Sequence, residues 1–86
     1  VIRKPLFTGQ GSLGAMSNRL QNRIGKRIRD IRISKGVSQS QLALMTSMTK
    51  SYMSEIEAGK KNLTLRTLQK IATSLGITLE DIFRGM

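Results

Sequence analysis

One short pattern occurs four times in this sequence and constrains the possible fold more than any other feature. Each copy has an apolar residue, then serine or threonine, then a second apolar residue four positions after the hydroxyl. The copies are Val37-Ser38 with Leu42, Met48-Thr49 with Met53, Leu63-Thr64 with Leu68, and Ile77-Thr78 with Ile82. A hydroxyl placed this way accepts a hydrogen bond from an unpaired N–H of a first helical turn, and the apolar pair closes over it. Each copy therefore predicts the start of a helix, and Ser38 with Gln41 predicts a capping box.

Glycines stand where the predicted helices should end. They are Gly36, Gly59, Gly76 and Gly85. A helix end often needs a left-handed residue, which glycine adopts without a Cβ penalty. Val37 and Ile77 are the only candidates for a strand nucleus, but each lies between such a glycine and a capping hydroxyl. The sequence thus predicts an all-α, compact five-helix domain.

The first predicted helix precedes the repeated pattern and runs from Leu20 to Gly36. Its apolar residues recur at helical spacing and predict a core stripe of Leu20, Ile24, Ile28 and Ile31. Basic residues surround this stripe. Taken singly, Arg19, Arg23, Arg27 and Arg29 are interpreted as a solvated face that raises the local positive potential.

The N-terminal segment has a different composition from the rest of the chain. It contains Pro5 and three glycines and shows no helical or strand period, which predicts a flexible arm over residues 1–16. Met16 is a candidate natural start, which would make the preceding residues an expression remnant. The alternative is an arm that wraps DNA through Arg3 and Lys4. The helical domain itself is predicted over residues 17–86.

Charge and missing residue types narrow the function. The formal net charge of +10 favours a phosphate polyanion as partner. Cysteine and histidine are absent, so disulfides, imidazole bases and most transition-metal sites are excluded and no cofactor is expected. The five acids form no convincing catalytic pair, which argues against an enzyme. No apolar run is long enough to span a membrane, and the basic first helix has no Trp or Phe for membrane binding, so a cytoplasmic protein is expected.

The spacing between two of the predicted helix starts indicates a helix-turn-helix. One helix runs from Ser38 to about Met45 and the next begins at Thr49, so only Thr46, Ser47 and Met48 connect them. In the second of these helices Thr49, Tyr52, Met53 and Ile56 are predicted to pack. Lys50, Ser51, Ser54, Glu55 and Ala58 are predicted to be free. Three of these residues are small, which would let the backbone approach the floor of a major groove about 12 Å wide.

In these residues the chain resembles the lambda repressor and Cro-like (XRE-type) helix-turn-helix regulators. The stretch SQSQLALMTSMTKSYMSEIEAGK carries the resemblance, chiefly through Gln39, Ala43, Met48, Met53 and Ile56, and it extends over Ile24 to Phe83. Ser47 departs from the family, which usually has glycine there, so this residue should adopt a left-handed or near-bridge backbone. The stretch GKKNLTLRTL looks most like the controller proteins of restriction-modification systems.

The resemblance implies separate sets of residues for base reading and for positioning on the DNA backbone. Base edges would be read by Lys50, Ser51, Ser54 and Glu55, with Glu55 accepting from cytosine N4. Phosphates would be held by Ser38, Gln39, Thr49, Tyr52, Lys60, Lys61 and Asn62. The family also implies a partly buried ion pair between Arg32 and Glu57. Leu79, Ile82 and Phe83 on the last helix are predicted to form a dimer contact, because Phe83 near the chain end has little to cover it.

Two functions follow as expectations. The first is a sequence-specific regulator that binds double-stranded DNA as a homodimer on a near-palindromic operator and occludes or recruits RNA polymerase. The alternative is an antitoxin that masks a toxin protein and autoregulates its operon.

Overall fold

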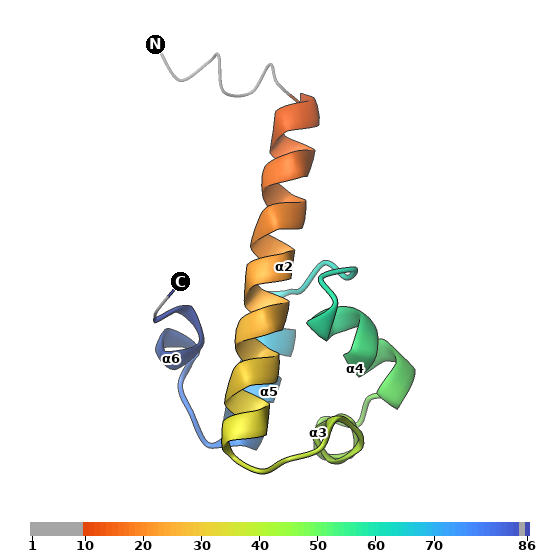
Figure 1. Cartoon of the computed structure of the whole chain (residues 1–86), viewed down its shortest axis with the longest axis vertical. Helices are drawn as coiled ribbons and strands as arrows, with labels where there is room; N and C mark the ends of the chain where they lie inside the picture. Colours follow the sequence, from red (N-terminus) through yellow and green to blue (C-terminus); the bar gives the residue numbers. More distant parts are fainter. Residues whose placement is uncertain (1–9, 85) are drawn as a thin grey trace.

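The computed structural model describes residues 10–84 and 86, and within that range the chain contains five helices and no strand (Figure 1). The helices are α2 (Gln10–Ser34), α3 (Gln39–Met45), α4 (Lys50–Glu57), α5 (Leu65–Leu75) and α6 (Leu79–Phe83). The predicted all-α, five-helix architecture is therefore confirmed. α3 and α4 form the helix-turn-helix, and α4 and α6 lie on opposite sides of the long α2 (Figure 1).

The four predicted helix starts are N-caps in the structure. Ser38, Thr49, Thr64 and Thr78 each have an extended backbone, and each side chain accepts a hydrogen bond from the N–H three residues later. The capping box of Ser38 and Gln41 forms as predicted. A second box joins Thr78 and Asp81, where hydrogen bonds from the backbone and side chain of Thr78 lower the pKa of the Asp81 carboxyl. The repeated pattern thus sets the start of every helix after α2.

The first helix is longer than predicted. α2 begins at Gln10, ten residues before Leu20, so the expectation of an arm without helical structure is wrong for residues 10–16. Once a packed segment has nucleated a helix, each further residue adds a hydrogen bond, and a glycine lowers helix stability by only about 1 kcal/mol. Residues 1–9, with Arg3 and Lys4, and the predicted helix stop at Gly85 lie outside the described residues.

The core is built from the apolar faces of all five helices. It consists of Ile24, Ile28, Ile31, Leu42, Ala43, Met53, Ile56, Leu68, Ile71, Ala72, Leu75 and Ile82. Leu20 was predicted to belong to the core stripe, but its side chain is 47% exposed. In Figure 1 the first turns of α2 extend beyond the other helices, and of the predicted stripe only Ile24, Ile28 and Ile31 are buried.

One arginine of α2 is more than part of a solvated face. The Arg27 guanidinium donates to the carbonyl oxygens of Asp81, at 2.9 Å, and Ile82, at 3.1 Å. These carbonyls belong to α6, a helix of five residues, and carbonyls near a helix end lack intrahelical partners. Arg27 therefore fastens α6 to α2.

Candidate nucleic-acid interface

The turn between α3 and α4 is fully supported by hydrogen bonds. The buried Thr46 hydroxyl donates to the carbonyl oxygens of Leu42, at 2.8 Å, and Ala43, at 3.0 Å. The Met48 N–H donates to the Ala43 carbonyl at 2.8 Å. Ser47 lies at φ 59°, in the left-handed region, as predicted for the residue that replaces the usual glycine. The left-handed backbone of Ser47 costs about 1 to 2 kcal/mol. The hydrogen bonds of Thr46 and Met48 on either side of it offset this cost.

The two faces of α4 differ as the sequence predicts, with two exceptions. Thr49 was predicted to pack but is exposed at the N-cap, where its hydroxyl accepts a hydrogen bond from the Tyr52 N–H. Met53 and Ile56 are buried, whereas Lys50, Ser51 and Ser54 are exposed. Tyr52 was predicted to pack, but it is 36% exposed, because it lies at the margin of the apolar stripe. The exposed face therefore presents small hydroxyls and one lysine, which suits close approach to base edges.

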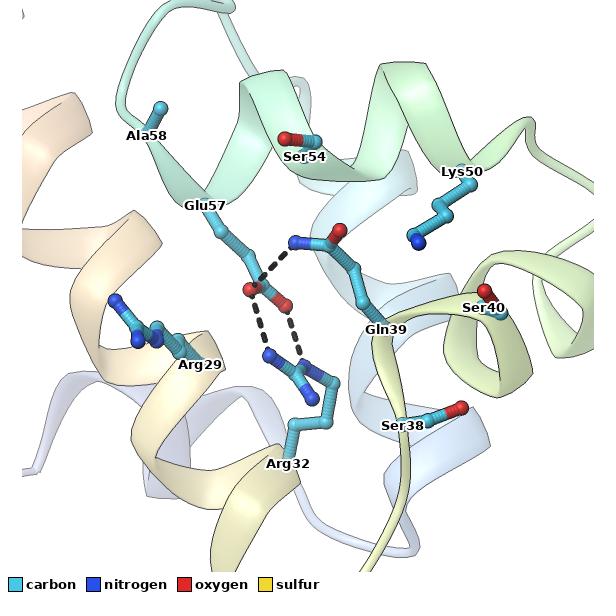
Figure 2. Close-up of a pocket in the computed structure, with 9 residues that line it drawn as sticks. All are labelled: Arg29, Arg32, Ser38, Gln39, Ser40, Lys50, Ser54, Glu57 and Ala58. Carbon is cyan, nitrogen blue, oxygen red and sulfur yellow. Dashed lines mark hydrogen bonds and ion pairs between the residues drawn. The ribbon is translucent and has the colours of Figure 1, made fainter.

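A groove of about 410 Å³ lies beside this face, between α2, the start of α3, and α4. It is lined by Arg29, Arg32, Ser38, Gln39, Ser40, Lys50, Ser54, Glu57 and Ala58. Figure 2 shows Arg29 and Lys50 on opposite sides, with Glu57 between Arg32 and Gln39. Arginine, lysine and serine side chains are typical donors to phosphate oxygens. The groove therefore gathers side chains of the kind that donate to anionic oxygens.

Sequence reasoning missed two residues of this groove, Arg29 and Ser40. Arg29 was interpreted as part of a solvated face, yet it stands three positions before Arg32 and so on the same side of α2. That spacing is the signal that could have identified it. Ser40 follows Gln39 directly and carried no signal of its own.

A buried ion pair fixes α4 against α2. Arg32 donates to both carboxylate oxygens of Glu57, at 2.7 and 3.0 Å, and to the Val37 carbonyl at 3.0 Å. The two side chains are only 10% and 4% exposed. Gln39, predicted as a phosphate ligand, also donates to Glu57, at 3.0 Å. The second N–H of the same amide remains available as a donor.

The loop after α4 holds three predicted phosphate ligands in different settings. Lys60 is exposed. Lys61 pairs with the carboxylate of Glu55 at 3.2 Å, and its ammonium lies 5.4 Å from the centre of the Tyr52 ring. The Asn62 side chain accepts a hydrogen bond from Gln21 of α2. Only Lys60 among them has no ion pair or side-chain hydrogen bond within the described part of the chain.

The predicted dimer residues do not share one exposed face. Ile82 is fully buried in the core of its own chain, so its prediction as a dimer contact is wrong. The pattern that placed a helix start at Thr78 requires Ile82 to close over the cap, which turns it inward. Leu79 is partly buried against the core, and Phe83 is 40% exposed. Phe83 is therefore the most exposed apolar side chain of α6.

No helix within the described ranges is both long enough and apolar enough to cross a membrane.

Comparisons with known proteins point to one family. A family model described as helix-turn-helix matches residues 28–82. The control protein C.BamHI of Bacillus amyloliquefaciens is 35% identical over 78% of this chain and 84% of its own length. The control protein C.MunI of Mycoplasma sp is 37% identical over 77% of this chain and 90% of its own. The crystal structure of the restriction-modification controller protein C.AhdI from Aeromonas hydrophila superposes with a TM-score of 0.71 and 35% identity, covering 73% of this chain and 96% of that chain.

Proposed function

The chain belongs to the helix-turn-helix family of XRE-type DNA-binding transcriptional regulators, and we propose that it binds a near-palindromic operator as a homodimer and controls the genes of a restriction-modification system. The observation that carries the proposal is the exposed face of α4. Lys50 and Ser54 on this face also line a groove that contains Arg29 and Arg32, and the buried Arg32–Glu57 ion pair holds the helix in place.

The roles of the residues follow from their positions. Lys50, Ser51 and Ser54 face outward on α4 and read base edges. Arg29 and Lys60, with the free N–H of Gln39, hold phosphates on either side of the recognition helix. Ser38 and Thr49 cap α3 and α4, and each hydroxyl keeps its own proton to donate to a phosphate.

The share of each relative's length that this chain matches supports a role in restriction-modification control. The two control proteins are matched over more than four fifths of their own length, and the C.AhdI chain over nearly all of it. This chain therefore corresponds to most of the length of each of these regulators. In this role the protein is not an enzyme, and its output is occlusion or recruitment of RNA polymerase.

Loss of the Lys50 ammonium tests the DNA-reading role. Duplexes selected by the wild-type protein from a random pool define the operator. Lys50→Ala is expected to lower discrimination at one operator position by about 1 to 3 kcal/mol while binding to random duplexes changes little. The matched control is Lys70→Ala, which removes the same charge from the exposed side of α5. Equal losses on operator and random DNA for Lys50→Ala would contradict the assignment.

Phe83 tests the homodimer. Phe83→Ser is expected to give monomers in sedimentation at micromolar concentration, and affinity for a full operator should fall to that for one half-site. Leu65→Ser is the control, since Leu65 is a still more exposed apolar residue, 70% exposed, at the start of α5. A Phe83→Ser protein that sediments as a dimer would argue against this interface. Co-purification of a small toxin with the wild-type chain would favour the antitoxin alternative.

A further inference from the structure

Three side chains meet beside the middle of the recognition helix α4, and we refer to Tyr52, Glu55 and Lys61 as the Lys61 cluster. Tyr52 and Glu55 are three positions apart on α4, so they are neighbours on its surface. Lys61 comes from the loop that follows. Its ammonium lies 3.2 Å from the Glu55 carboxylate and 5.4 Å from the centre of the Tyr52 ring. One cation therefore contacts both helix residues.

The adjacent lysine provides a contrast within the same loop. Lys61 and Glu55 neutralise each other, whereas Lys60 is exposed and forms no ion pair within the described residues. A lysine strengthens DNA binding by neutralising a phosphate and releasing its counterion. A lysine already paired with a carboxylate gains less from that exchange. Lys60 is thus the better phosphate ligand, although the two lysines are adjacent and the sequence does not distinguish them.

The carboxylate of Glu55 needs a nearby positive charge if it is to contact a base edge in DNA. A bare carboxylate is repelled by the phosphates on both sides of the groove. It also has several rotatable bonds, which binding would have to immobilise. The ammonium of Lys61 offsets the charge, and the Tyr52 ring supports the lysine by a cation–π contact. The pair is partly exposed, at 38% for Lys61 and 45% for Glu55, so Lys61 favours one orientation of Glu55 and weakens its repulsion from the phosphates before DNA arrives.

We propose that Lys61 is a positioning residue that holds Glu55 as the acceptor for a base amino group, cytosine N4 or adenine N6, in the major groove. This inference rests on the proposed DNA-binding function and adds a specificity determinant to it. Guanine O6 and thymine O4 are themselves acceptors, so a fixed carboxylate opposite them is repelled. Glu55 thus selects by exclusion as well as by attraction.

A double-mutant cycle tests the proposal on the duplex that the wild-type protein selects. Lys61→Met keeps an aliphatic stem over Tyr52 and removes the charge, and Glu55→Gln removes the carboxylate charge with little change in shape. Each variant is expected to lower discrimination at the same base pair by roughly tenfold. The double variant should lose no more discrimination than either single variant. Lys61→Arg, which keeps the positive charge, should discriminate as well as the wild-type protein.

Salt dependence separates positioning from phosphate contact. The slope of log Kobs against log salt is expected to stay unchanged in Lys61→Met, whereas the matched variant Lys60→Met should lower it by about one without altering base preference. The inference is overturned if Lys61→Met lowers the slope by about one and weakens all duplexes alike, or if the two substitutions affect different base pairs. A wild-type protein that selects no sequence at all would overturn the proposed function as well, which distinguishes the two failures.

Discussion

Gly25→Ala is expected to destabilise the domain by about 3 kcal/mol, although alanine is the better helix former. A Cβ atom at position 25 would lie 2.5 Å from the Ile56 carbonyl oxygen and 2.6 Å from that of Glu57. Both oxygens belong to the backbone of α4, so neither can turn aside without moving the helix. Urea unfolding followed by circular dichroism at 222 nm measures the change. Because α4 is the displaced element, operator affinity should fall even where the protein is still folded.

Gly76→Ala is the matched control for this substitution. Gly76 has a φ of 71°, but no atom lies within 4 Å of the place where its Cβ would stand. The expected loss is therefore only the left-handed backbone cost of about 1 to 2 kcal/mol, with operator affinity unchanged in the folded protein. A Gly25→Ala protein as stable as the wild type, or stabilised by the gain in helix propensity, would show that α2 and α4 do not cross so closely.

Glu57→Ala is expected to cost about 3 to 5 kcal/mol of folding free energy and to weaken operator binding. The carboxylate receives two hydrogen bonds from Arg32 and one from Gln39. Its removal leaves the Arg32 guanidinium buried without its counter-charge, since that side chain is only 10% exposed. The same network joins α2 to the first residue of α3 and the last residue of α4. Operator binding should therefore fall together with stability.

The double substitution Arg32→Met with Glu57→Leu separates the two effects. Replacing both charges with apolar groups of similar size is often close to neutral for stability. The double variant is therefore expected to be more stable than Glu57→Ala alone, measured by the same urea unfolding. If the double variant were as unstable as the single one, the cost would come from lost packing and not from an unpaired buried charge.

The helix starts and the turn of the helix-turn-helix could be predicted because they depend on neighbours in sequence. A cap accepts a hydrogen bond from an N–H three residues later, and the two members of its apolar pair are five positions apart. Ser38, Thr49, Thr64 and Thr78 are therefore caps in the structure as in the prediction. The left-handed backbone at Ser47 was likewise predicted from its place in the turn.

The exposure of single residues could not be predicted in the same way. Leu20 continues the apolar stripe of α2, yet its side chain is 47% exposed, whereas Ile24 one turn later is buried. Phe83 and Ile82 are adjacent in a helix of five residues, and only contact with α2 and α5 decides which of them is buried. Arg27 and Arg29 have the same charge and similar sequence neighbours, yet one fastens α6 and the other lines the groove beside α4.

The sequence by itself determined the five-helix class, the helix starts after α2, the helix-turn-helix and the residues on the exposed face of α4. Only the tertiary structure decided which charges are free. Lys61 is paired with Glu55 and Gln39 is bound to Glu57. Of the three groove cations, Arg32 is paired with Glu57, whereas Arg29 and Lys50 come from different helices. The physical reason is the sequence separation over which each interaction acts. Capping and periodicity act over three to four residues, whereas side-chain pairing depends on the distances set when helices remote in sequence pack together.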